Sequence, residues 1–158
     1  QWYETQFTGE KAEVFTMNLA TAGTYTIEVS PSDLDEGTID LQLKTPGGGP
    51  LLKTDGTPRA VAIGNQGIAW YSMNVEAGTA YTAQVTGLGF EPTTGSPGVA
   101  MHLYSPSGTW INTSCTFTTS KLSCDLGPSL FTVGGTYSLA YIPTAGYATG
   151  FSASMTKK

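Results

Sequence analysis

The stretch that decides the fold is YSMNVEAGTAYT, residues 71–82. Its first part alternates apolar and polar side chains, so that Tyr71, Met73 and Val75 lie on one face of an extended chain. A period of two residues is the pattern of a β-strand with one buried face. The strand ends in a tight turn, where Gly78 supplies the positive φ that such a turn requires.

Related stretches occur twice more, which indicates an internal repeat. The glycine of the Gly-Thr pair recurs as Gly23, Gly78 and Gly135. The first and third copies share an uninterrupted Gly-Thr-Tyr, whereas the middle copy contains the additional Ala80. This alternation predicts that one sandwich is built from two half-units of different type. The tyrosines at the equivalent position are expected to be structural: Tyr25, Tyr81 and Tyr137.

The same period of two residues continues along the chain, and no stretch of ten residues keeps the helical period of 3.6. Further strands are expected over residues 15–19, 25–29, 39–43, 99–104 and 137–141. The sequence therefore predicts an all-β fold, an antiparallel, jelly-roll-like β-sandwich of about ten to twelve short strands built from repeated half-units.

Two parts are expected along the chain. Residues 51–158 are predicted to form a complete sandwich module, because they contain one copy of each type. Residues 1–50 are then an N-terminal half-unit, either the end of a preceding sandwich or an extra layer on this one. A half-unit cannot cover its own apolar face, so we expect this part to pack on another element.

Composition and charge exclude several classes of function. The 158 residues carry 7 basic and 12 acidic side chains, a net charge of −5. A nucleic-acid binder would need a basic patch, so no nucleic-acid partner is expected. The apolar runs are too short for membrane insertion. The chain does not open with a basic and then apolar leader, so any signal peptide is expected to have been removed or to lie upstream.

The two cysteines, Cys115 and Cys124, are separated by eight residues. Two ligands are too few for a structural zinc site, and the spacing is not that of a Cys-x-x-Cys redox pair. The spacing suits a short β-hairpin whose arms are joined by a disulfide, and the alternative is two free buried thiols. A disulfide would place the protein in an oxidising compartment.

The Gly-Thr-Tyr-[Thr/Ser] turns and the glycine-led last strand, residues 150–155, resemble bacterial pre-peptidase C-terminal-like modules. Such jelly-roll modules are repeated in secreted peptidases and in Rhs-type surface proteins. The resemblance implies a non-catalytic accessory domain that is extracellular, on the cell surface or periplasmic. Some relatives bind calcium. Here Asp33, Asp35 and Glu36 are the candidate ligands, in a loop whose alternative interpretation is simple solvation; no other cofactor is expected.

The remaining candidates for function are aromatic. Trp70 is out of phase with Tyr71 and should face outward, although it could instead cover a neighbouring sheet or domain. The candidate ligand-binding residues are Trp70, Trp110, Tyr104 and His102. Exposed aromatic rings on a sandwich stack on sugar rings or dock other proteins. His102 is the only histidine, and no Gly-x-Ser-x-Gly motif accompanies it, so no catalytic residue is assigned.

The sequence thus predicts a non-catalytic extracellular module of a larger bacterial protein, serving as a spacer, an adhesion domain or a substrate-binding accessory domain. One alternative is a carbohydrate-binding module that uses its exposed aromatics, and a second is a small secreted hydrolase. The expected partners are other domains of the parent protein, with a polysaccharide or a surface protein as further candidates.

Overall fold

The structure is a computed structural model that describes residues 19, 21–28, 41–43, 45, 47–64, 67–91, 97–144 and 148–158. In these residues the chain forms eight strands and one short 3-10 helix, η1. The elements are β1 (Arg59–Ile63), β2 (Ala69–Val75), β3 (Tyr81–Glu91), β4 (Val99–Tyr104), β5 (Trp110–Phe117), β6 (Ser123–Leu126), η1 (Pro128–Leu130), β7 (Gly135–Pro143) and β8 (Ala148–Lys157).

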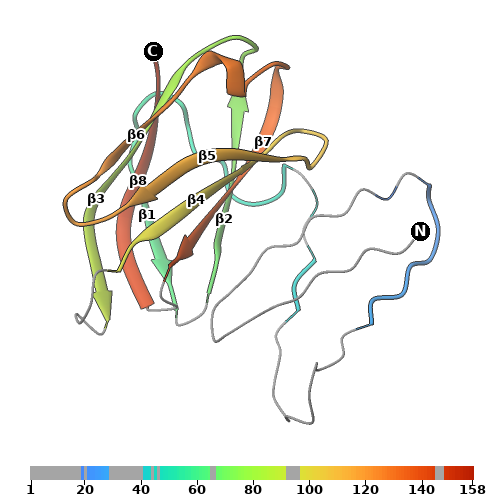
Figure 1. Ribbon diagram of the computed structural model, residues 1–158, viewed down its shortest axis with the longest axis horizontal. Helices are drawn as coiled ribbons and strands as arrows, with labels where there is room; N and C mark the ends of the chain where they lie inside the picture. Colours follow the sequence, from blue (N-terminus) through green and yellow to red (C-terminus); the bar gives the residue numbers. More distant parts are fainter. Residues whose placement is uncertain are drawn as a thin grey trace.

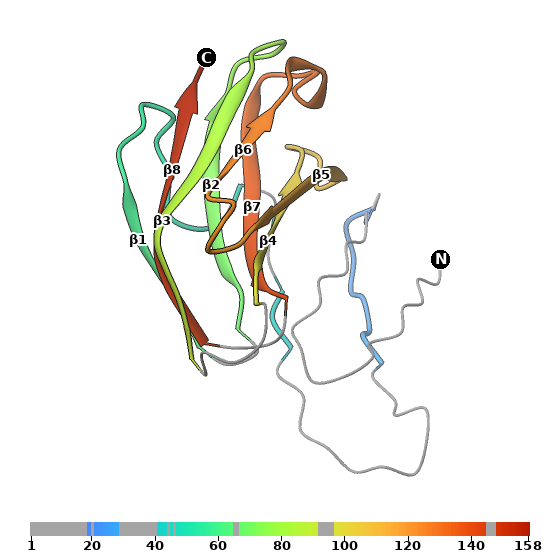
Figure 2. The same cartoon turned by 60° about the vertical axis from the view of Figure 1, so that its left-hand side comes forward.

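The strands form two antiparallel four-stranded sheets that pack face to face as a sandwich (Figures 1 and 2). One sheet has the order β1-β8-β3-β6 and the other the order β2-β7-β4-β5. Four nested antiparallel pairs follow from this order, β4 with β5 innermost, then β3 with β6, β2 with β7 and β1 with β8. A long hairpin rolled in this way is a jelly roll, so the predicted fold class is confirmed.

The core lies between the sheets and follows the alternation of the sequence. Tyr71, Met73 and Val75 of β2 are all buried, as the period of two predicted. The largest core side chains come from every layer of the sandwich. They include Tyr81, Leu103, Phe117, Phe131, Tyr137, Tyr141 and Met155.

The free edge of β2 is covered by the chain that precedes β1. Ser72 N donates to Pro50 O over 3.0 Å, and Leu52 N donates to Ser72 O over 2.8 Å, so Leu51 pairs with Ser72 as a parallel bridge. Leu52 enters the core and is fully buried. This short addition protects an edge strand that could otherwise pair with another chain.

The repeated Gly-Thr elements take different places in the fold. Gly78 has φ +68° and lies between β2 and β3, which belong to opposite sheets rather than being neighbours. Gly135 begins β7, and the residues before it are η1 and irregular chain, not the strand that the repeat predicts. Pro128 starts η1, and Phe131 then turns inward to be fully buried, which ends the alternation. Tyr81 and Tyr137 nevertheless share a structural role, because both pack against Phe131.

The described residues of the N-terminal part, 19, 21–28, 41–43, 45 and 47–50, contain no strand. Their large apolar side chains are exposed, among them Tyr25 at 48% and Leu43 at 73%. The expected structural role of Tyr25 is therefore not seen. An alternating pattern gives a stable strand only when a partner and an apolar layer are present. The division of the chain at residue 50 stays a prediction.

No helix among the described residues is long and apolar enough to cross a membrane.

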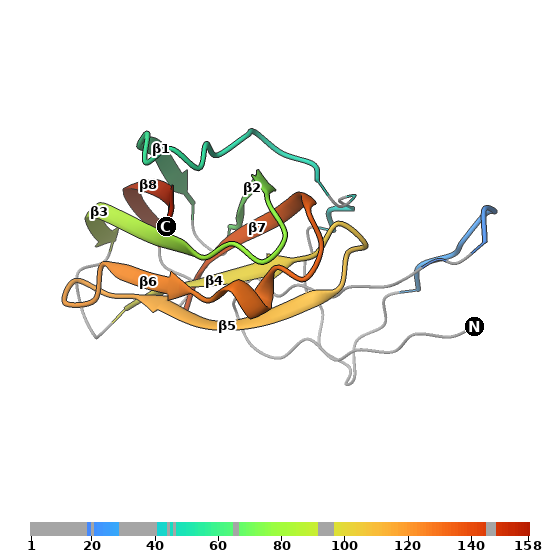
Figure 3. The ribbon, with the colours of Figure 1, turned by 90° about the horizontal axis from the view of Figure 1, so that it is seen from above.

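The predicted disulfide is present between Cys115 and Cys124, whose Cα atoms are 5.9 Å apart. The two cysteines do not lie on the arms of a simple hairpin, however. A tight turn with a Thr118–Lys121 bridge separates β5 from β6, and the two strands then enter different sheets. Figure 3 shows β5 and β6 side by side along one edge of the sandwich. The disulfide therefore joins the two sheets at that edge.

Tyr141 provides a direct test of this core. Its hydroxyl is completely buried and has no hydrogen-bond partner in the described part of the chain, and burial raises its pKa. An unsatisfied buried hydroxyl is costly, so Tyr141→Phe is expected to raise the free energy of unfolding by about 1–2 kcal/mol. Chemical denaturation of both proteins measures this difference.

Tyr137→Phe is the matched control. The Tyr137 hydroxyl donates to Val133 O over 2.9 Å, so its removal should lower the free energy of unfolding by about 1 kcal/mol. Equal effects of the two substitutions would contradict the assignment of Tyr141 as the unsatisfied group.

Candidate functional site

The sheet β2-β7-β4-β5 has an unusual composition. Its four strands, all described in full, contain no Asp, Glu, Lys or Arg. The opposite sheet carries charged residues, for example Arg59 on β1 and Asp125 on β6. The outward face of the first sheet is therefore uncharged, which is uncommon for a surface open to water.

All four predicted ligand-binding residues lie on this outward face. On β2 and β4, Tyr71, Met101 and Leu103 point into the core, so Trp70, His102 and Tyr104 point outward by alternation. The register places Trp70 and His102 on either side of Ala140 of β7. Tyr104 pairs with Trp110 at the start of β5. Side chains from three strands thus meet on one surface.

One half of this face is covered. Trp70 and Tyr104 pack with their ring centroids 5.7 Å apart, and Tyr104 is only 4% exposed. The chain at residues 47–50 crosses the neighbouring strands, where Gly47 N donates to Ser138 Oγ over 2.7 Å. Gly49 approaches so closely, with φ +99°, that a Cβ atom there would lie 2.9 Å from Trp70 O. Tyr104 and Trp70 therefore pack beneath the surface and offer little area to a ligand.

The other half is open. Trp110 is 50% exposed, and its ring centroid lies 6.0 Å from that of the half-buried His102. The Tyr104 hydroxyl lies 3.5 Å from His102 Nδ1. Burial lowers the pKa of His102, so its ring is neutral at pH 7, and one ring nitrogen can then donate a hydrogen bond while the other accepts one. The exposed Trp110 and the half-buried His102 beside it form the part of the face that a ligand can reach.

This arrangement does not resemble the machinery of a hydrolase. A histidine base needs an acid to orient it and a nucleophile beside it, and the described strands of the face bring neither a carboxylate nor an activated serine to His102. A pocket of about 210 Å³ lies elsewhere, lined in part by Lys53 and Asp55. Hydrogen bonds from Thr57 lower the pKa of Asp55, so this carboxylate stays ionised and is unsuited to act as a general acid.

Metal binding finds no support among the residues described. They contain no cluster of three or more His, Cys, Asp or Glu side chains that could hold an ion. The predicted calcium ligands Asp33, Asp35 and Glu36 lie outside the described residues.

Sequence reasoning gave one part of the face no binding role. Residues 112–114 form a bulge in β5 beside His102, and their only sequence signal is an Asn-x-Ser triplet, which also matches a glycosylation sequon. Asn followed two residues later by Ser is typical of a turn in which the Asn side chain accepts a hydrogen bond from the backbone N–H two residues further along.

No protein-family model and no curated protein matches the sequence. Among solved structures, the chain is similar to the pre-peptidase C-terminal domain of a collagenase from Bacillus anthracis, at 13% identity and a TM-score of 0.43, over 72% of this chain and 99% of that chain. It is also similar to PliG of Salmonella Typhimurium, a periplasmic lysozyme inhibitor of g-type lysozyme, at 11% identity and a TM-score of 0.38, over 70% of this chain and 100% of that chain. Both similarities are distant and concern the β-sandwich fold alone. The first is to a domain of the kind that the sequence resembles.

Proposed function

We propose that this chain is a non-catalytic extracellular β-sandwich module that binds an uncharged polysaccharide through the face of β2, β7, β4 and β5. The observation that carries the proposal is the exposed Trp110 beside the half-buried His102, on a sheet whose four strands contain no charged residue. In a larger protein, such a module would act as a substrate-binding accessory domain, with other domains as its neighbours.

The chemistry of the face fits a neutral sugar. An indole ring offers a flat apolar surface, on which the C–H face of a pyranose can stack, while its edge remains polar. The neutral ring of His102 can exchange hydrogen bonds with sugar hydroxyls at the same time. An acidic polysaccharide or a nucleic acid would require cationic side chains, and the described strands of this face contain none.

The disulfide supports the proposed location. Disulfides persist in oxidising compartments outside the cytosol. Here Cys115–Cys124 joins β5, the strand that carries Trp110, to β6 at the edge of the sandwich. A module that works outside the cell benefits from this covalent closure.

Trp110→Ala tests the proposal. Depletion assays with insoluble cellulose, chitin and starch should show binding by the unmodified protein, and the variant should bind about tenfold more weakly or worse, because aromatic anchors dominate such contacts. Binding to a neutral ligand should also persist in 1 M sodium chloride, since no ion pair is involved.

Val133→Ala is the matched control, because Val133 is 53% exposed and lies outside the proposed face. It should bind as the unmodified protein does. A protein that binds none of these polysaccharides, or a Trp110→Ala variant of unchanged affinity, would contradict the proposal and favour a spacer or a protein-binding module.

A further inference from the structure

We propose that the bulge at Asn112–Ser114 is the hydrogen-bonding half of this site, and that the amide Nδ2 of Asn112 donates to a hydroxyl or ring oxygen of the bound sugar. This inference rests on the proposed function, because it takes the same ligand class. It adds a contact that selects among neutral sugars, which stacking on Trp110 alone does poorly.

The register of β4 and β5 places the bulge beside His102. Leu103 pairs with Ile111 and Met101 pairs with Cys115, so the three residues 112–114 lie opposite the single residue His102. Extra residues of this kind re-aim side chains, and they are over-represented at sheet edges and near functional sites. Here β5 is the edge strand of its sheet, so the residues of the bulge lie at the rim of the outward face that carries Trp110 and His102.

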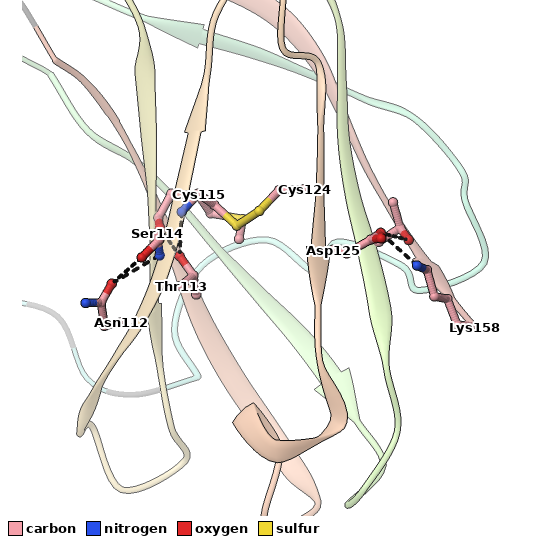
Figure 4. Close-up of a disulfide and its surroundings, with 9 residues drawn as sticks. Asn112, Thr113, Ser114, Cys115, Cys124, Asp125 and Lys158 are labelled. Carbon is pink, nitrogen blue, oxygen red and sulfur yellow. Dashed lines mark hydrogen bonds and ion pairs between the residues drawn. A yellow bond between two sulfur atoms is a disulfide. The ribbon is translucent and has the colours of Figure 1, made fainter.

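Hydrogen bonds and the disulfide hold the bulge in place. Thr113 Oγ1 donates to Met101 O over 2.9 Å, and Cys115 N donates to Thr113 Oγ1 over 3.3 Å. Cys115, the next residue in the chain, is fixed by the disulfide. Figure 4 shows Asn112 on the side of β5 opposite Cys124, so the disulfide holds the strand without blocking the outward side.

The orientation of the Asn112 amide follows from its partners. Its Oδ1 accepts Ser114 N over 3.1 Å and Ser114 Oγ over 3.3 Å. A backbone N–H can only donate, so the atom it meets must be the amide oxygen. Ser114 adopts φ +50° to make this turn, a conformation that is uncommon for a residue other than glycine. The amide nitrogen therefore points away from the turn, and its hydrogens have no acceptor within the described part of the chain.

Asn112 and Trp110 are separated by one residue, so they share the outward side of β5, and both are exposed. The site then consists of the flat ring of Trp110, the neutral imidazole of His102 and the amide donor of Asn112. Trp110 and Asn112 both lie on β5, the strand that the disulfide anchors covalently. A donor held in place before binding loses little conformational freedom when the ligand arrives. This combination is suited to a hydroxyl-rich, uncharged ligand.

Asn112→Asp isolates the donor. The carboxylate oxygen can still accept Ser114 N, so the turn is kept, but the Nδ2 hydrogens are lost. Isothermal titration calorimetry with cellohexaose, N-acetylchitohexaose and maltohexaose at pH 7.5 should show the best of these ligands binding about five- to tenfold more weakly to the variant. Thermal unfolding should be unchanged. If this variant does not fold, Asn112→Ser takes its place, because a serine hydroxyl can accept the same N–H.

Thr116→Ala is the matched control, because Thr116 is an exposed residue of the same strand beyond the bulge. It should bind normally. If Asn112→Asp and Thr116→Ala both bind normally while Trp110→Ala does not, the role of Asn112 is overturned and the proposed function stands. If the unmodified protein binds none of the three oligosaccharides and none of the insoluble polysaccharides, both are overturned.

Discussion

Replacing Phe131 with Ala is expected to lower the free energy of unfolding by about 3–5 kcal/mol, the usual cost of removing a large aromatic side chain from a core. Phe131 is fully buried between Tyr81 and Tyr137, with ring centroids 5.1 and 5.4 Å away and both contacts edge-to-face. The variant would lose the apolar burial and both ring contacts, and the two tyrosines cannot both move into the space.

Denaturant unfolding, followed by tryptophan fluorescence, measures this loss. Val133→Ala is again the appropriate control, because Val133 lies two residues away and is exposed, so its truncation should change the stability by less than about 0.5 kcal/mol. A loss below about 1.5 kcal/mol for Phe131→Ala would show that the core relaxes around the gap and that the aromatic cluster does not organise this end of the sandwich.

Removing the disulfide is expected to have the next largest effect. The double variant Cys115→Ala, Cys124→Ala should lose about 2–3 kcal/mol of stability, because the short loop between the cysteines is no longer closed in the unfolded chain. Alanine is the suitable replacement for Cys115, which is buried, since a serine would place a hydroxyl in an apolar setting.

A reductant provides the control for this second experiment. Dithiothreitol should lower the unfolding midpoint of the unmodified protein towards that of the double variant and leave the double variant unchanged. Intact-mass analysis should show alkylation of both cysteines only after reduction. A midpoint that does not respond to reductant would mean that the sheets stay joined at the β5–β6 edge without the covalent bond.

Much of the sandwich could be predicted from alternation alone. Tyr71, Met73 and Val75 are buried, and Trp70 lies on the opposite side of β2, as its phase in the sequence indicated. Alternation failed to predict the structure at two places, one where η1 and the buried Phe131 interrupt it and one where the described residues have no partner strand. The copy that includes Phe131 forms no strand before Gly135, and the described residues 21–28 form none either.

The candidate site was only partly accessible to sequence reasoning. Trp110 and His102 could be named as aromatic candidates, but their proximity depends on the register of β4 and β5. That register shifts at the bulge, and neither a glycine nor a proline marks the bulge in the sequence. Asn112 became visible as a candidate only when the hydrogen bonds from Ser114 were known.

The nested order of the strands also bears on how the chain reaches this fold. The innermost pair, β4 with β5, joins residues close in sequence, and only a short turn with Gly108 at φ +82° separates the two strands. The outermost pair joins Arg59 to Ala153, so its two strands are separated by most of the folded chain. Pairing between residues so distant in sequence carries a large loop-closure cost and makes folding slow. We therefore expect the edge strand β1, which pairs with β8, to be ordered last in a newly made chain, and until then its unpaired edge is open to pairing with other chains.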